Sequence, residues 1–214
     1  MKLLFRKAIS KDAASIAALI NSAYRGESSR YGWTTEADLL SGLRTEVDEV
    51  MSLIAADNTM LLLCFDATTL LGSVTLEKQC NVAHLGMFAV HPQQQGQGIG
   101  KQLLAFAEHA AVETWDVKSM VMSVITLRQE LIAFYQRRGY SLTGALKPFP
   151  AESKLWTPLV SSLQLGLMEK SLDPHIPARK VRPSMTHTNK NFAVMTVRKA
   201  LWLIAIACGC CCLS

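Results

Sequence analysis

Three glycines in five residues, Gly96, Gly98 and Gly100, lie between an apolar run at 85–90 and a segment with helical spacing. The apolar run is typical of a buried strand, which Pro92 ends. A strand that passes through a glycine-rich turn into a helix directs unpaired backbone N–H groups and the positive end of the helix dipole at one point. This arrangement binds a phosphate or a diphosphate.

Three kinds of anion-binding loop place glycines between a strand and a helix, as this segment does. A P-loop requires Ser or Thr after its Gly-Lys, but Gln102 follows Lys101. A dinucleotide loop requires Gly-x-Gly-x-x-Gly, and the second spacing here is one residue too short. The remaining pattern, Gln95-x-x-Gly98-x-Gly100, resembles the diphosphate loop of GNAT-type N-acetyltransferases, which bind acetyl-coenzyme A. On this motif alone, a plain turn between strand and helix stays open.

A second motif lies downstream, between Arg128 and Tyr140. It resembles the late helix of the same family, which ends in Tyr-x-x-x-Gly-Phe/Tyr. Gly139 suits a helix C-cap. Residues 3–8 and 12–20 resemble the first strand and first helix of the family, and 144–172 resemble its closing loop and last strand. The resemblance therefore covers residues 1–172, and we expect 173–214 to form a basic and then apolar, Cys-rich tail outside the core.

The sequence pattern predicts an α/β fold with helices on both faces of a mixed sheet. The resemblance makes this a GNAT fold with six to seven strands. Strands are expected at 3–8, 60–66, 70–77, 83–90, 119–125, 140–143 and 162–171. Helices are expected at 12–24, 35–43, 45–52, 98–114 and 128–137, with loops at 25–34 and 144–158.

The cofactor-binding residues follow from the two motifs. The diphosphate of acetyl-CoA is expected on the main chain of Gln95, Gly96, Gln97, Gly98, Ile99 and Gly100. The resemblance implies that the pantetheine arm binds the main chain of Phe88, Ala89 and Val90, where strands 83–90 and 119–125 splay apart at a bulge. Arg128 replaces an Asn that often holds this arm in the family. It either contacts the cofactor or simply begins the helix.

Tyr135 is the candidate general acid. The resemblance implies that it lies near the cofactor sulfur, and a pKa of about 10 keeps a tyrosine protonated at neutral pH. The alternative is a core aromatic residue whose hydroxyl is already hydrogen-bonded. For the base we select Glu77, with Glu36 and His84 as alternatives; the family frequently relays the proton through water. Cys64 and Cys80 have no evident activating partner, so packing is favoured over an acetyl-cysteine intermediate.

The acceptor side is expected to be shaped by Tyr24, Arg25 and residues 33–36. Arg25 and Arg30 suggest an acidic group on the acceptor. We therefore predict an N-acetyltransferase that moves the acetyl group of acetyl-CoA to the primary amine of a small-molecule or amino-acid-like acceptor, by direct attack in a ternary complex. The alternatives are a protein or peptide N-terminal acetyltransferase and a non-catalytic CoA-binding regulatory module.

Charge is divided unevenly along the 214 residues. Lys and Arg total 22 and Asp and Glu total 17; residues 173–214 hold six of the basic and one of the acidic residues, so 1–172 carry 16 of each. A neutral domain gives no electrostatic support for nucleic-acid binding. No Cys-x-x-Cys or His cluster precedes the tail, so no metal is expected.

The remaining expectations concern the setting of the protein. The first residues lack a signal-peptide pattern, and the Cys usage fits a reducing, cytoplasmic compartment. Residues 200–213 are uncharged and rich in Cys, which suggests weak membrane association as one role of the tail. A non-functional extension is favoured over this anchor. A homodimer is a further expectation, because related folds often pair through exposed strands.

Overall fold

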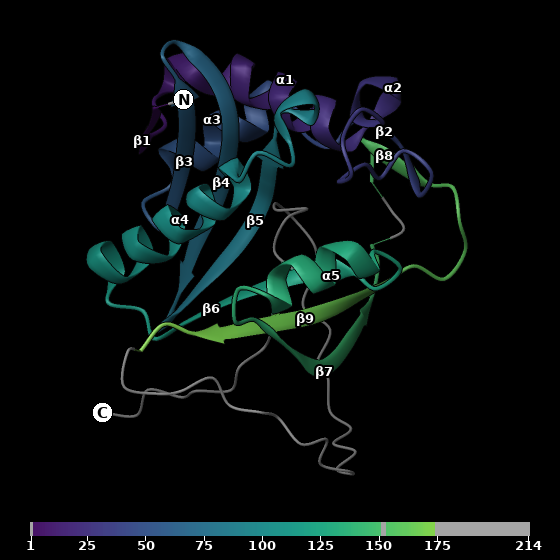
Figure 1. The fold of residues 1–214 in the computed structure, drawn as a ribbon. Helices are drawn as coiled ribbons and strands as arrows, with labels where there is room; N and C mark the ends of the chain where they lie inside the picture. Colours follow the sequence, from purple (N-terminus) through teal and green to yellow (C-terminus); the bar gives the residue numbers. More distant parts are fainter. Residues whose placement is uncertain (1, 151–152, 174–214) are drawn as a thin grey trace. The chain divides into compact units, whose positions relative to one another are not determined.

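The sheet around which the molecule is built has seven strands. The computed structural model describes residues 2–150 and 153–173 (Figure 1). The strand order is β1-β3-β4-β5-β6-β9-β7, and only β5 and β6 are parallel neighbours. The strands are β1 (Leu3–Lys7), β3 (Thr59–Asp66), β4 (Thr69–Gln79), β5 (Val82–Val90), β6 (Ser119–Ile125), β7 (Ser141–Pro148) and β9 (Gln164–Ser171). The predicted α/β fold with a mixed sheet is confirmed.

Helices cover both faces of this sheet (Figure 1). Helices α1 and α3 pack on one face, against β4, β5 and β3, while α4 packs against β3, β4 and β5 from the other. Helix α5 shares the apolar core of α4. The helices are α1 (Ala13–Tyr24), α2 (Gly26–Ser29), α3 (Val47–Ala55), α4 (Ile99–Trp115) and α5 (Gln129–Gln136), with 3₁₀ turns η1 (Ser10–Asp12) and η2 (Pro92–Gln94).

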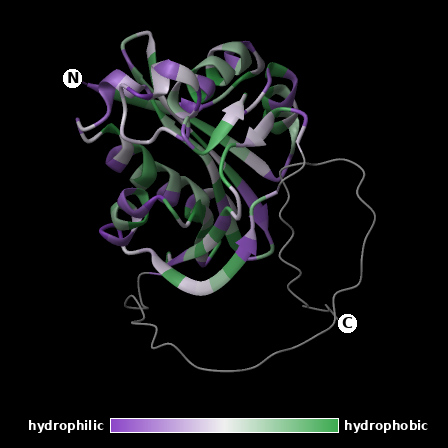
Figure 2. Cartoon of the chain, turned by 90° about the vertical axis from the view of Figure 1, so that its right-hand side faces the viewer, coloured by the Kyte–Doolittle hydropathy of each residue, from purple (hydrophilic) through white to green (hydrophobic). Residues whose placement is uncertain are grey.

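The amphipathic pattern of α4 explains why it forms and which face it buries. Its buried residues are spaced three and four apart, at Ile99, Leu103, Leu104, Ala107 and Ala111. In Figure 2 the helices carry hydrophobic and hydrophilic stretches side by side, as expected for helices with one face on a core. Burying this apolar stripe fixes the N-terminus of α4 next to the end of β5.

Three expectations for the connecting segments were wrong. Residues 35–43 do not form a helix: one turn closes at Glu36, and Leu40–Gly42 then form strand β2. This strand pairs with β8 (Trp156–Pro158), which lies in the segment expected to be a loop. The pairing joins residues more than 100 positions apart, so local spacing does not reveal it. The expected loop at 25–34 contains the short helix α2.

Within residues 2–150 and 153–173, no helix is long and apolar enough to cross a membrane. The expectations for the tail fall on residues outside the described part of the chain, apart from Asp173.

Candidate active site

Strands β5 and β6 separate at the centre of the sheet. They pair over three residues only, the last pair being His84 with Val121, although β5 continues to Val90. Beyond His84 the two strands diverge, which leaves backbone groups of β5 without a neighbouring strand (Figure 1). The expected splay of these strands is confirmed.

A β-bulge lies in the separated part of β5. Ser73 of β4 pairs with Ala89 and Thr75 pairs with Gly86, so Val74 alone faces two residues of β5. One of them, Met87, has a φ of +43°, a left-handed conformation that a non-glycine residue rarely adopts. Such a bulge bends its strand and redirects the following residues. It points the end of β5 toward the opening between the strands.

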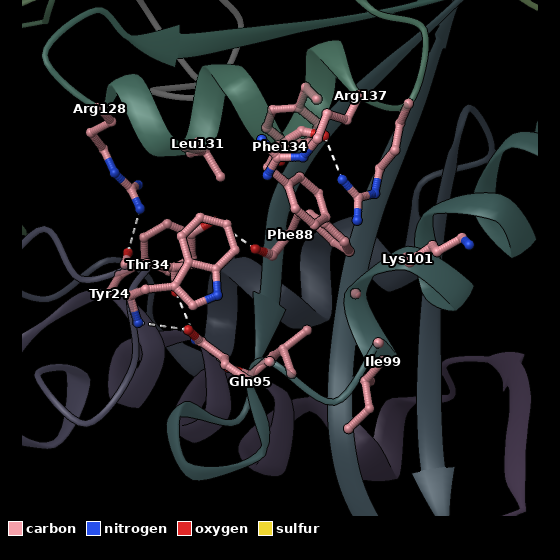
Figure 3. Close-up of a pocket in the computed structure, with 17 residues that line it drawn as sticks. Tyr24, Thr34, Phe88, Gln95, Ile99, Lys101, Arg128, Leu131, Phe134 and Arg137 are labelled. Atoms are coloured by element: carbon pink, nitrogen blue, oxygen red, sulfur yellow. Dashed lines mark hydrogen bonds between the residues drawn. The ribbon is translucent and has the colours of Figure 1, made fainter.

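A cavity of about 290 Å³ lies in this opening (Figure 3). Its walls come from the end of α1, the segment after it, the end of β5, the glycine loop and α5. The lining residues are Tyr24, Trp33, Thr34, Phe88, Val90, Gln95, Gly96, Gly98, Ile99, Gly100, Lys101, Arg128, Leu131, Phe134, Tyr135, Arg137 and Arg138.

The glycine loop presents free N–H groups to this cavity. Gly96 and Gly98 both have φ of +82°, and Gly98 is the N-cap of α4. A Cβ added at either glycine would have no atom within 4 Å, so neighbouring atoms would not exclude a side chain. Glycine is required here because of the left-handed backbone conformation. Among the described residues, no hydrogen-bond acceptor contacts the N–H of Gly96, Gln97 or Gly98. These donors and the helix N-terminus fit a diphosphate.

Tyr135 lies in an aromatic cluster that forms one wall. Its ring is 6.3 Å from the ring of Phe88 and meets that of Phe134 edge-on at 5.3 Å. The residue is 4% exposed, and within the described chain its hydroxyl makes no hydrogen bond. Burial raises the pKa of Tyr135 well above the ordinary value of a tyrosine. The group therefore stays protonated and can donate.

The same wall carries positive charge. Lys101 of α4 and Arg128, Arg137 and Arg138 around α5 line the cavity, and no acidic residue in the described part of the chain does so. The guanidinium of Arg138 lies 3.4 Å from the centre of the Phe134 ring and donates to the Phe134 carbonyl. Burial and the neighbouring Arg137 lower the pKa of Arg138 from its ordinary value. A cavity of this charge suits an anionic ligand.

A segment that we call the strap, residues 32–36, contributes Trp33 and Thr34 to the lining of the cavity, where Figure 3 shows Thr34 near Arg128. On one side, the carboxamide of Gln95 accepts a hydrogen bond from the Trp33 N–H at 2.9 Å and donates to Thr34 Oγ1 at 2.7 Å. On the other, Arg128 Nη2 donates to the Thr34 carbonyl at 2.6 Å. The strap thus joins the glycine loop to the start of α5.

Glu36 anchors the end of the strap between two arginines. Its Oε1 lies 2.9 Å from Arg128 Nη1 and its Oε2 bonds Arg25 Nη1, and all three side chains are less than 10% exposed. Arg25 and Glu36 therefore neutralise each other instead of facing an acceptor. Arg30 is also committed, to Asp38 and Glu27 at the surface. The acidic acceptor group that Arg25 and Arg30 suggested has no support from these two residues.

A family model described as "Acetyltransferase (GNAT) domain" matches residues 42–149, about half of the chain. The chain belongs to the GNAT acetyltransferase family. It is accordingly an acetyltransferase, and its acetyl donor is acetyl-CoA. A comparison with curated proteins finds no match.

Solved structures share the GNAT fold at low sequence identity. YncA of Salmonella typhimurium, a putative acetyltransferase solved with acetyl-CoA, is 18% identical with a TM-score of 0.61; the alignment covers 85% of this chain and 100% of that one. The ribosomal-protein-S18-alanine N-acetyltransferase of Escherichia coli is 14% identical, with a TM-score of 0.61 and coverage of 89% and 100%. PaiA N-acetyltransferase of Thermoplasma acidophilum, solved with coenzyme A, is 19% identical, with a TM-score of 0.57 and coverage of 80% and 99%.

Most of the site residues predicted from sequence lie together in this GNAT cavity. The lining includes Phe88, Val90, Gln95, Gly96, Gly98, Ile99, Gly100, Arg128 and Tyr135. Ala89 is buried behind it and Gln97 is exposed beside it, so only their main chain could serve a ligand.

Two base candidates lie outside the lining. Glu77 pairs with His84 across β4 and β5, four residues before Phe88, and its carboxylate accepts weak hydrogen bonds from Asn58 and Gln79. At about 3.3 Å per residue, this places Glu77 roughly 13 Å along the strand from the bulge. Burial lowers the pKa of His84, which leaves it neutral.

The cationic and aromatic residues Lys101, Phe134, Arg137 and Arg138 were not predicted as site residues. The sequence carries a signal for them, since all four adjoin a motif residue: Lys101 follows Gly100, and the others flank Tyr135 within two turns of helix. Their direction toward the cavity depends on how α5 rotates on the sheet, which the motif does not specify.

Proposed function

We propose that this GNAT protein acetylates the primary amine of a small-molecule or amino-acid-like acceptor by direct attack on the thioester in a ternary complex. The observation that carries the proposal is the hydroxyl of Tyr135, a cavity-lining residue that is 4% exposed; this hydroxyl is protonated and has no partner among the described residues. Because Tyr135 lines the cavity and its hydroxyl bonds no described residue, this hydroxyl is available as a donor to a ligand in the cavity.

In this proposal each part of the cavity has one task. The N–H groups of the glycine loop and the cations Lys101, Arg137 and Arg138 hold the phosphates. The stretch of β5 at Phe88 and Val90, which has no neighbouring strand on the β6 side, receives the pantetheine arm. The amine nitrogen bonds to the acetyl carbon as the carbon–sulfur bond breaks, and Tyr135 gives its proton to the departing sulfur. The nitrogen loses one proton as the amide forms, and water returns a proton to Tyr135.

Direct attack is favoured because neither of the two cysteines in the described part of the chain is placed to carry the acetyl group. Cys64 is fully buried in the core, and burial raises the pKa of its thiol to about 11. Cys80 is exposed, in the turn between β4 and β5. Neither lines the cavity, and a thiol needs a lowered pKa to act as a nucleophile near neutral pH.

Water is the proposed carrier of the amine proton. Glu36 is ion-paired to two arginines, and among the described residues no carboxylate or imidazole lines the cavity. The acceptor amine would therefore enter neutral or lose its proton to solvent.

The charge of the cavity is positive before acetyl-CoA binds. Four cationic side chains line it, and none of its described lining residues is acidic. Arg128 remains part of this lining although two of its nitrogens bind the strap. Since Lys101, Arg137 and Arg138 hold the phosphates in this proposal, this field acts on acetyl-CoA, and an acceptor panel decides between an amino-acid-like acceptor and a polyamine.

The test is thiol release from acetyl-CoA in the presence of an acceptor panel. The panel should hold neutral and acidic amino acids, simple alkylamines, spermidine and an alanine-terminated peptide, since one protein of similar fold acts on ribosomal protein S18. We expect the highest kcat/KM with an acidic or neutral amino acid. Preference for the peptide would support N-terminal acetylation instead. Binding of CoA without turnover on any acceptor would support the regulatory module.

A further inference from the structure

The side chain of Gln95 is directed away from the diphosphate site. Its Oε1 accepts from the Trp33 N–H, and its Nε2 donates to Thr34 Oγ1 at 2.7 Å and to the Val90 carbonyl at 3.0 Å. A carboxamide offers two donors and one acceptor oxygen, so these contacts occupy both of its donors. Gln95 therefore connects the strap to the end of β5, although its main chain belongs to the glycine loop.

Gly32 makes this contact sterically possible. A Cβ built on Gly32 would lie 2.6 to 2.8 Å from the three terminal atoms of Gln95, closer than real Cβ contacts allow. The φ of Gly32 is not in the left-handed region, so alanine fits the backbone there. Alanine at position 32 would displace the carboxamide of Gln95 without touching the glycine loop itself.

The strap that Gln95 holds is a wall of the cavity. Trp33 and Thr34 line it, and the Trp33 ring lies 5.5 Å from the ring of Phe134 on α5. Arg128 binds the Thr34 carbonyl from the opposite side (Figure 3). Trp33 and Thr34 are thus held by two hydrogen bonds with Gln95 and one from Arg128. The strap is anchored further along the chain by the contacts of Thr35 and Glu36.

We propose that Gln95 is a positioning residue for the acceptor: its main chain serves acetyl-CoA, while its side chain sets the acceptor-side wall through Trp33 and Thr34. The proposal rests on the proposed function, because that function assigns the glycine loop to the diphosphate. It implies that removing the carboxamide weakens acceptor binding and leaves CoA binding unchanged.

The experiment breaks the contact between Gln95 and the strap by a substitution in either partner. Gln95→Met removes the hydrogen bonds and keeps the side-chain length, while Gly32→Ala pushes the carboxamide away. Gln93→Met is the matched control, since Gln93 is exposed in the same turn and does not line the cavity. The measurements are CoA affinity by calorimetry, hydrogen exchange of the peptide containing Trp33, and the KM of the best acceptor in the panel.

We expect each single variant to raise exchange at the Trp33 amide and acceptor KM about tenfold, with kcat and CoA affinity within about twofold. Because both substitutions break one contact, the double variant should show about tenfold and not about a hundredfold. Gln93→Met should behave as the wild type.

Three results would overturn the inference. Gln95→Met could lose CoA affinity while hydrogen exchange at the Trp33 amide stays unchanged, or Gly32→Ala could behave as the wild type. The third is a double variant whose acceptor KM rises by the product of the two single effects. The exchange measurement is made on the protein without CoA. If wild-type protein binds no CoA, the proposed function fails, but the exchange result still decides whether Gln95 holds the strap.

Discussion

At the scale of single residues, Tyr24, Tyr135 and Tyr140 differ in what their hydroxyls contact. Tyr24 donates to the Phe88 carbonyl at 2.9 Å, and Tyr140 donates to Glu108 at the same distance. Tyr135 lies 5.8 Å from the Tyr140 ring, yet its own hydroxyl has no partner in the described chain. Of these three tyrosines, it is the one whose proton is free for a ligand.

Replacing Tyr135 with Phe tests this role. The ring packing is retained while the donor is lost, so we expect kcat to fall about 10²-fold with CoA affinity nearly unchanged. Steady-state kinetics and calorimetry measure the two quantities. Wild-type turnover in Tyr135→Phe would remove the residue from the mechanism.

The pH profile provides an independent check on the same residue. Because burial raises the pKa of Tyr135, the group stays protonated beyond pH 10, where an ordinary tyrosine ionises. We expect kcat to rise or stay level with pH as the acceptor amine loses its proton. A fall in kcat between about pH 8 and pH 10, absent from Tyr135→Phe, would contradict a raised pKa.

Glu36 is expected to contribute to the unfolding free energy of the protein and not to acetyl transfer. Glu36→Gln leaves the Arg25 and Arg128 guanidinium groups buried without a counter-charge, which costs about 3 to 5 kcal/mol of unfolding free energy. Asp38→Asn is the control, because its ion pair with Arg30 is exposed and contributes at most about 1 kcal/mol. Urea denaturation measures both. Equal effects of the two substitutions would mean that the buried network contributes no more than the surface pair.

At the scale of elements, local sequence specified the segment from β5 to α4 to within one or two residues. Proline, the glycines and the helical spacing all act over a few residues, so their positions can be found without the rest of the chain. The pairing of β2 with β8 and the contact of Gln95 with the strap join positions 116 and about 62 residues apart. Such contacts depend on how complete elements pack, and the sequence pattern did not reveal them.

A substitution at Gly100, in the first turn of α4, should affect stability and CoA affinity in opposite directions. An added Cβ would touch Phe88, Val90 and Phe134 at ordinary contact distances, so Gly100→Ala should be tolerated and should gain up to about 1 kcal/mol of helix stability. The methyl group would also occupy the cavity. We therefore expect an unchanged or higher Tm with CoA affinity reduced about tenfold. A variant that binds CoA as tightly as the wild type would show that this part of the cavity is not used.

At the scale of the whole molecule, positive charge is concentrated on the lining of the cavity between β5 and α5. Residues 1–172 carry as many acidic as basic residues, but all the charged side chains known to line the cavity are cationic. The cavity thus attracts anions although the domain has no net charge. The compartment, the homodimer and the membrane contact of residues 200–213 stay predictions.

Salt should weaken CoA binding because the attraction is local and electrostatic. Raising the ionic strength from about 0.1 M to about 1 M shortens the screening length from about 10 Å to about 3 Å. We expect a clear loss of CoA affinity over this range by calorimetry, and a smaller loss for Lys101→Gln. Lys2→Gln, at the exposed start of β1, serves as the control and should keep the wild-type dependence. An affinity independent of salt would argue against the cations as phosphate ligands.

The separation of β5 from β6 also bears on what can bind along β5. Unpaired strand backbone is a template to which another polypeptide can add, and proteins block such edges. Here the carbonyls of Phe88 and Val90 are already occupied by the side chains of Tyr24 and Gln95. A foreign strand that paired here would have to displace both side chains, whereas a small molecule can bind beside them.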